Sequence, residues 1–139
     1  MTVPPALIAA YRAAIYEVDA DGEALAFHVD QPSAALDALL AAHGAAEAVL
    51  ITAYNPRSKI QSEEQNAVAH GALIEAVRGA GKRGVLARAR DPDGNGPAEA
   101  GLFVFDLSRD DGLALARRFG QYAIVVVERG GAPALVFTE

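Results

Sequence analysis

Amide and hydroxyl side chains gather after one apolar run of the sequence. Thr52, Asn55 and Ser58 end or follow the run 46–52, and Asn66 comes soon afterwards. Such groups donate and accept hydrogen bonds but transfer protons poorly, so they suit ligand recognition better than acid–base catalysis. We therefore expect either a small-molecule pocket here or internal bracing of the loop 55–58 by the same groups.

Two later polar residues, Glu99 and Gln121, precede apolar runs and are expected to join this cluster. The predicted ligand-binding residues are then Thr52, Asn55, Ser58, Asn66, Glu99 and Gln121. An alternative hypothesis is an enzyme in which Glu63 or Glu99 acts as acid or base, with a pKa raised by burial. We expect neither carboxylate to titrate far above an exposed glutamate.

Other motifs indicate no metal and no cofactor. The segment 91–96 has oxygen ligands at alternate positions, like a calcium loop, but Leu102 stands where the bidentate glutamate belongs. We predict a plain turn there. The glycine pattern of 79–84 follows a helical segment and predicts a helix end rather than a dinucleotide loop. The histidines lack metal-ligand spacing, and no serine lies in a nucleophile-elbow motif.

Composition and charge argue against several classes of partner. A chain of 139 residues that is 52% hydrophobic can bury a core, whereas its net charge of -6 argues against nucleic-acid binding. No apolar run is long enough for a transmembrane helix, and no secretory signal is evident. The absence of cysteine suits a reducing cytoplasm, and abundant alanine and arginine are typical of GC-rich bacterial codons. We expect a bacterial, cytoplasmic protein that binds no membrane.

The expected partner is a small molecule. A third hypothesis is a homodimerising interaction module that binds no ligand and uses the polar cluster only as bracing. Such a module would expose a large apolar patch as a monomer.

Helices and strands are predicted from caps, turns and apolar periodicity. Three main helices are expected at 33–43, 62–80 and 108–119, each beginning at a capping serine, after a short first helix at 4–12. The predicted strands are 14–18, 25–29, 46–52, 85–89, 102–105, 123–127 and 134–137. The run 46–52 is apolar throughout, which is typical of a central strand covered on both faces.

These elements predict one α+β domain over residues 1–139, with a mixed β-sheet packed against three main helices. The helix 108–119 should make strands 102–105 and 123–127 point the same way through a right-handed crossover. Glu99 and Gln121 then reach Asn55 only if that pair runs antiparallel to strand 46–52. A doubly wound, three-layer α/β sheet is the alternative, and it would place the two groups of residues at opposite edges.

The chain resembles the bacterial family catalogued as domain of unknown function 3293. The resemblance rests on Ile51-Thr52-Ala53-Tyr54-Asn55-Pro56-Arg57-Ser58, Asn66, Asp91-Pro92-Asp93-Gly94, Glu99 and Ala116-Arg117-Arg118-Phe119-Gly120-Gln121-Tyr122-Ala123-Ile124. It covers about residues 12–138, and the chain departs from the family pattern at Ala100-Gly101. The resemblance implies a shared set of polar residues and no particular activity or substrate.

Overall fold

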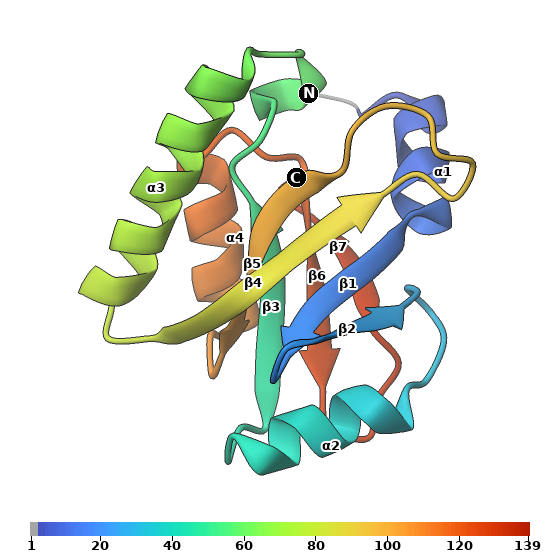
Figure 1. Cartoon of the computed structure of the whole chain (residues 1–139), viewed down its shortest axis with the longest axis vertical. Coiled ribbons are helices and arrows are strands. Elements are labelled where there is room, and N and C mark those ends of the chain that lie inside the picture. The colour runs from blue at the N-terminus through green and yellow to red at the C-terminus, as the bar shows by residue number, and fades with distance from the viewer. Residues whose placement is uncertain (1–2) are drawn as a thin grey trace.

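The helices and strands of the computed structural model follow the apolar periodicities of the sequence over residues 3–139, which are the residues the structure describes (Figure 1). The helices are α1 (Pro5–Ala13), α2 (Ala34–Ala42), α3 (Glu63–Gly79) and α4 (Arg109–Arg118), with a short 3-10 turn at Pro56–Ser58. The strands are β1 (Ile15–Ala20), β2 (Glu23–Phe27), β3 (Glu47–Thr52), β4 (Arg83–Arg90), β5 (Glu99–Phe105), β6 (Ala123–Glu128) and β7 (Ala134–Phe137).

Serine side chains begin α2, α3 and α4, as the sequence predicts. Ser33 and Ser108 each accept a hydrogen bond from the backbone N–H three residues on, and Ser62 forms a reciprocal capping box with Gln65. Gly120 follows α4 with a φ of +69°, a conformation that glycine adopts at little cost. The helix starts are therefore fixed locally, by hydrogen bonds within each first turn.

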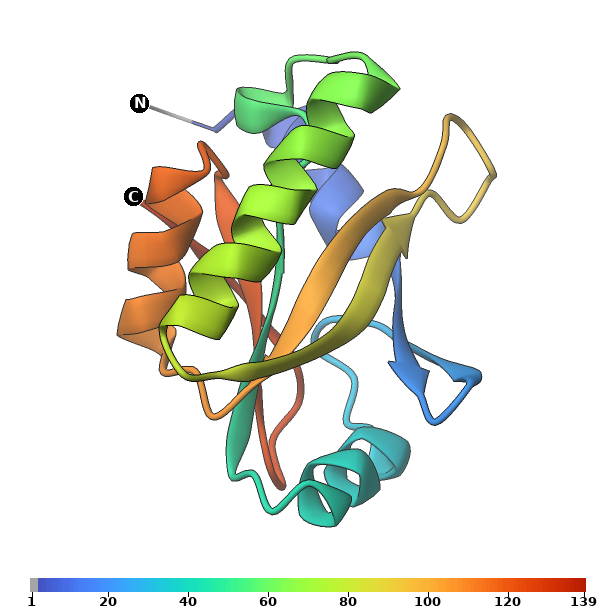
Figure 2. The ribbon, with the colours of Figure 1, turned by 60° about the vertical axis from the view of Figure 1, so that its left-hand side comes forward.

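The strands form one sheet in the order β2-β1-β4-β5-β3-β6-β7. Every ladder in it is antiparallel. This pairing excludes the doubly wound parallel alternative and confirms the α+β class. Figure 2 shows α3 and α4 side by side on one face of the sheet, with α1 on the other.

Strands β5 and β6 point the same way, as predicted, because both run antiparallel to β3. The predicted mixed sheet is nevertheless wrong in its pairing. β3 lies between β5 and β6, so the crossover through α4 connects two strands that share no hydrogen bonds. A same-direction pair can thus exist without a parallel ladder when a third strand is inserted between its members.

Two apolar cores flank the sheet, and β3 contributes to both. Ala48 and Leu50 pack with α2, whereas Val49 and Ile51 pack with α3 and α4. Alternate residues of a strand point to opposite faces, so a strand buried on both sides is apolar throughout. The prediction of a central strand at 46–52 is confirmed. Gly112 of α4 lets the helix approach this strand, since a Cβ there would lie 3.1 Å from Val49 Cγ2.

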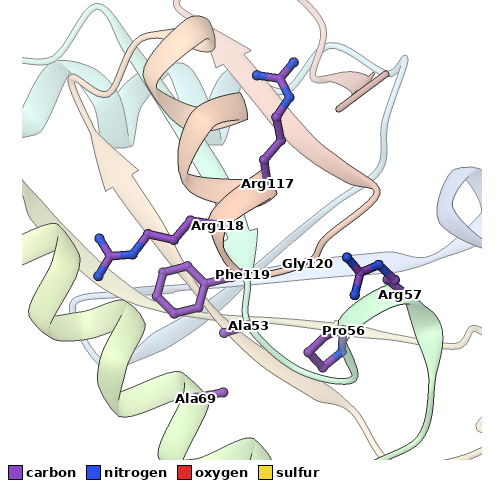
Figure 3. A pocket seen from close by; sticks show the side chains of 8 residues that line it. All are labelled: Ala53, Pro56, Arg57, Ala69, Arg117, Arg118, Phe119 and Gly120. Atoms are coloured by element: carbon purple, nitrogen blue, oxygen red, sulfur yellow. The ribbon is translucent and has the colours of Figure 1, made fainter. Parts of the chain in front are cut away.

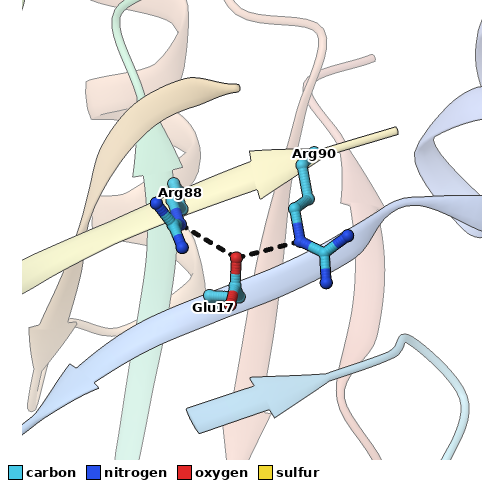
Figure 4. Close-up of polar contacts among 3 residues, drawn as sticks. All are labelled: Glu17, Arg88 and Arg90. Carbon is cyan, nitrogen blue, oxygen red and sulfur yellow. Dashed lines mark hydrogen bonds and ion pairs between the residues drawn. The ribbon is translucent and has the colours of Figure 1, made fainter. Parts of the chain in front are cut away.

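β4 carries basic residues, which are typical of a solvated edge strand, yet it does not lie at the edge of the sheet. β4 is an interior strand paired with both β1 and β5. Arg88 and Arg90 donate from Nε to one carboxylate oxygen of Glu17 on β1, over 2.8 and 3.0 Å (Figure 4). Glu17 is buried, and these charge-assisted hydrogen bonds hold the pKa of its carboxyl below the usual range.

Candidate functional site

The predicted polar residues meet at one edge of the sheet. Thr52 ends β3, Glu99 begins β5, and Gln121 lies just before β6. Because β5 and β6 run antiparallel to β3, the end of β3 and the starts of the other two strands share this edge. The loop that leaves β3 and enters α3 closes it, and is drawn above the sheet in Figure 1.

Asn55 and Asn66 join this loop to α3 through paired amides. The Asn55 backbone N–H donates to Asn66 Oδ1 over 2.9 Å, and Asn66 Nδ2 donates to Asn55 Oδ1 over 3.0 Å. The Gln61 backbone N–H donates to the same Asn55 oxygen. Asn66 is only 5% exposed, so these hydrogen bonds replace water for both of its polar atoms. This arrangement favours the bracing interpretation of the two asparagines.

Glu99 holds Asn55 from the other face of the sheet. Asn55 Nδ2 donates to Glu99 Oε2 over 2.8 Å. Glu99 pairs with Ala89, which in turn pairs with Tyr16, so all three side chains lie on the face that α1 covers. Burial raises the pKa of the Glu99 carboxyl, and the Asn55 hydrogen bond partly offsets that rise.

Thr52 and Gln121 hold the start of the loop. Thr52 Oγ1 donates to the Ala100 carbonyl over 2.6 Å and accepts from the Tyr54 N–H over 3.0 Å. Gln121 Nε2 donates to the Tyr54 carbonyl over 3.0 Å. Both side chains therefore donate to backbone carbonyls.

Ser58 and Glu63 are the candidate residues most open to solvent. Ser58 is exposed, and its hydroxyl lies 3.3 Å from the hydroxyl of Tyr11 on α1. Glu63 lies on the exposed first turn of α3, and no hydrogen bond within the described residues connects it to the Asn55 cluster. The structure thus brings Thr52, Asn55, Asn66, Glu99 and Gln121 together and leaves Glu63 outside.

The loop has an unusual backbone. Asn55, Arg57 and Ser58 have φ values of +45°, +54° and +58°. A residue other than glycine in this region costs about 1–3 kcal/mol, and such residues persist where surrounding contacts force them, often at functional sites. Here the Arg57 N–H donates to the Gly120 carbonyl over 2.7 Å, and the Ser58 N–H donates to the Asn55 carbonyl. The amide network therefore holds a strained loop in place.

An open cavity of about 310 Å³ lies between this loop, the second turn of α3 and the end of α4 (Figure 3). Its lining residues are Ala53, Pro56, Arg57, Ala69, Arg117, Arg118, Phe119 and Gly120. None of the six predicted ligand-binding residues lines it.

Sequence reasoning missed the arginines and Phe119 as site residues. The available signal was their position inside the two segments on which the family resemblance rests. An adjacent hollow of about 340 Å³ shares Arg57, Arg117 and Gly120 with the cavity and includes Gln121 in its lining. Gln121 is thus the one predicted residue that reaches a hollow surface.

His70 on α3 lies near the loop. Its ring meets that of Tyr54 edge-on at a centroid distance of 6.2 Å, and its buried Nδ1 has no hydrogen-bond partner among residues 3–139. Burial lowers the pKa of the imidazole. The neutral ring therefore packs as a mostly apolar group on α3.

Within residues 3–139, no set of three histidine, cysteine or acidic side chains is arranged to hold a metal ion. The segment 91–96 is a hydrogen-bonded turn, in which Asp91 Oδ2 accepts from the backbone N–H groups of Asp93 and Asn95. No helix among the same residues is long and apolar enough to cross a membrane.

A family model described as "Protein of unknown function (DUF3293)" matches residues 51–124, more than half of the chain. The protein belongs to the DUF3293 family. The matched segment begins in β3 and ends in β6, so it contains the strained loop, α3, α4 and every lining residue of the cavity. No curated protein and no solved structure shows significant similarity to this DUF3293 chain.

Proposed function

We propose that this DUF3293 protein binds a small molecule in the cavity between the Asn55–Ser58 loop and the end of α4. The observation that carries the proposal is the strained backbone of this loop, which forms one wall of the cavity. Strain of this kind is maintained at ligand-binding sites because it fixes a geometry that an ordinary turn would not present. The cavity has the volume of sites that take small organic molecules, about 300 Å³ or more.

The six predicted residues have two roles in this proposal. Thr52, Asn55, Asn66 and Glu99 position the loop, because their polar atoms bond one another or the backbone. Ser58 is exposed at the end of the loop, and Gln121 lines the hollow beside the cavity. The ligand would then contact the residues that the loop presents to the cavity. The amide cluster would contribute indirectly, because it holds these residues in position.

A second candidate function is catalysis by Glu99, which its burial and raised pKa favour. The reacting group would lie on the α1 face, beside Tyr11 and Ser58, and not in the cavity on the α3 and α4 face. Conversion of a substrate by the wild-type protein, abolished in Glu99→Gln, would support this alternative.

The partners and location proposed from composition are a small ligand and a bacterial cytoplasm. A homodimerising module is the competing proposal, and the exposed side chains of Ile60, Val68 and Leu86 are the large apolar groups it could use. Sedimentation of the purified protein tests this competitor, since a stable dimer would fit the interaction hypothesis.

Nuclear magnetic resonance of the ¹⁵N-labelled protein with a mixed library of small fragments tests the binding proposal. We expect bound fragments to shift the amide signals of residues 53–58 and 117–121. Ala69→Leu, which fills the cavity from α3, should abolish those shifts. Ala72→Leu is the matched control, because Ala72 is exposed on the same helix. Fragments that bind Ala69→Leu as well as the wild type, or a library without binders, would contradict the proposal.

A further inference from the structure

We propose that the cavity recognises an organic oxyanion, meaning a carboxylate or phosphate group carried on a small apolar body. This inference rests on the proposed function, since it names the class of ligand for the same cavity. It follows from three observations: the positive charges that line the cavity, the guanidinium N–H donors that form no hydrogen bond, and the apolar surface between the charged groups.

The lining of the cavity is positively charged in an acidic protein. Arg57, Arg117 and Arg118 line it and no acidic residue does, although the whole chain has a net charge of -6. The acidic Glu139 lines the adjacent hollow, together with Arg57 and Arg117. Ion pairs between described residues use other arginines, namely Arg12, Arg78, Arg88 and Arg90. The three lining arginines therefore have no carboxylate partner among the described residues, and a ligand oxyanion could supply one.

The three arginines differ in the contacts that their guanidinium groups already form within the protein. Arg117 donates from Nε and Nη2 to the Thr138 carbonyl, over 3.1 and 2.9 Å. The Arg118 guanidinium lies 5.4 Å from the centre of the Phe119 ring. Figure 3 shows Arg118 and Arg57 on either side of this ring, with Arg117 directed away. Arg57 and Arg118 are thus the groups that a ligand would contact.

Arg57 is held at the cavity by its backbone. Its φ is +54° and its N–H donates to the Gly120 carbonyl, so the strained turn fixes where this side chain begins. No hydrogen bond or ion pair of the Arg57 side chain is present among the described residues, and the residue is exposed. The strain that carries the proposed function therefore presents a guanidinium with all its donors free.

The helix dipole explains only part of this arrangement. Arginine in the last turn of a helix complements the negative end of its dipole, which accounts for Arg117 and Arg118. The carbonyls at that end already accept hydrogen bonds from the N–H groups of Phe119, Gly120 and Gln121. These carbonyls therefore do not require the arginine side chains as donors. The dipole of α4 does not explain Arg57, because Arg57 lies on a different segment.

Apolar groups complete the site. Ala53, Pro56, Ala69 and Phe119 supply apolar lining surface. A ring or short chain would pack there while its acidic group contacts the guanidinium of Arg57 or Arg118. Guanidinium is the side chain best shaped to bind carboxylate and phosphate through two parallel hydrogen bonds.

Four probes with the same ring test the inference: benzoate, phenyl phosphate, neutral benzyl alcohol and cationic benzylamine. We expect the two anions to bind most tightly, measured by amide shifts of residues 53–58 and 117–121, and to bind more weakly as salt is added. Arg57→Gln and Arg118→Gln should each weaken the anions about tenfold, the loss expected for a charge-assisted hydrogen bond. Arg57→Lys should retain part of the affinity.

Arg78→Gln is the matched control, because Arg78 is exposed on α3 and lies outside the cavity lining. It should leave anion binding unchanged. Benzyl alcohol binding as tightly as the anions, or anions that bind both glutamine variants normally, would overturn the inference while leaving the cavity a ligand site. If no probe shifts these amides, the inference is overturned, and the fragment test with Ala69→Leu separately decides the proposed function. A preference between benzoate and phenyl phosphate identifies the acidic group.

Discussion

Asn66 does not line the cavity, yet it helps to hold the loop that does. Its two amide atoms bond both the backbone and the side chain of Asn55. Asn66→Ala removes the hydrogen-bond acceptor of the half-buried Asn55 N–H and leaves Asn55 Oδ1 with the Gln61 N–H alone. We expect a loss of about 1–3 kcal/mol in the free energy of unfolding, the usual cost of an unpaired buried polar group. Urea denaturation measures this loss.

The control for this substitution is Asn95→Ala, since Asn95 is exposed in the turn after β4. Its stability should stay within about 0.5 kcal/mol of the wild type. Equal midpoints for the Asn66 variant and the wild type would show that the amide pair does not brace the loop.

Glu99 gives a second prediction, about pH. Its folded pKa is raised by burial, so the folded state holds its proton to higher pH than the unfolded state does. The stability that Glu99 contributes is complete below the ordinary glutamate pKa of about 4.3 and is lost as pH rises through the raised folded value. Glu99→Gln, which stays neutral, should therefore become more stable relative to the wild type across that pH range.

Carboxylate NMR titration gives the folded pKa directly, for comparison with the ordinary glutamate value of about 4.3. A Glu99 signal that titrates at or below that value would contradict the effect of burial. A pKa far above it would strengthen the catalytic alternative.

Residue types predicted the amide cluster, whereas the guanidinium groups were not predicted. Asn66 was identifiable because an asparagine on the apolar face of a helix needs a partner, and the nearest polar loop supplies one. Arg57 carries no comparable signal, since an arginine after proline is ordinary in an exposed loop. Its importance comes from a positive φ and from contact with Gly120, which depend on how two distant segments meet.

At the scale of elements, the contact between the loop and the end of α4 depends on Gly120. Its φ is +69°, and a Cβ there would lie 2.9 Å from Pro56 Cβ. Gly120→Ala should cost about 1–2 kcal/mol for the left-handed backbone, and more because Pro56 must move. Thermal or urea denaturation measures the total.

Gly130→Ala is a matched control, because Gly130 has a φ of +86° and open space around its Cα. It should show the backbone cost alone and leave the amide shifts of residues 55–58 unchanged. If both alanine variants lose the same stability and neither shifts those amides, the Pro56 contact has no role in holding the loop.

The turn between β4 and β5 is the element we expect to open most easily. Residues 92–98 are all exposed, and the hydrogen bonds of the turn are local ones to Asp91. Limited proteolysis should cut the folded protein first in this segment, as located by mass spectrometry. Millimolar calcium should leave the cleavage rate unchanged, whereas protection would indicate a calcium site.

Helix boundaries could be predicted better than strand boundaries, for a physical reason. Caps act within a few residues, so Ser33, Ser62 and Ser108 indicated helix starts from local sequence alone. Strand length depends on the partner. β4 extends to Arg83–Arg90, beyond the predicted 85–89, because β1 and β5 both supply hydrogen bonds along it. No local signal carried that information.

At the scale of the whole molecule, the direction of the strands could be predicted and their neighbours could not. The crossover rule correctly gave β5 and β6 one direction and so placed Glu99 and Gln121 at one edge. That this edge also holds Asn55 depended on a separate assumption, that both strands run antiparallel to β3, and the pairing confirms it. The insertion of β3 between them follows from long-range packing of its two apolar faces. Gly101 permits this close pairing, since a Cβ there would collide with the backbone carbonyl of Ile51.

Glu17 joins the β1–β2 hairpin to the rest of the sheet, and its pH dependence should be opposite in sign to that of Glu99. Arg88 and Arg90 lower its pKa, so its contribution to stability is present above the ordinary glutamate pKa of about 4.3 and is lost as pH falls through the lower folded value.

Glu17→Gln should cost about 1 kcal/mol at neutral pH, a modest figure because both arginines are half exposed. The deficit should shrink in acid. Glu23→Gln, at the exposed start of β2, is the control and should follow the wild type. Urea denaturation from pH 2 to 8 tests this, and a deficit in Glu17→Gln that stays constant over that range would show that the ion pairs do not stabilise the hairpin.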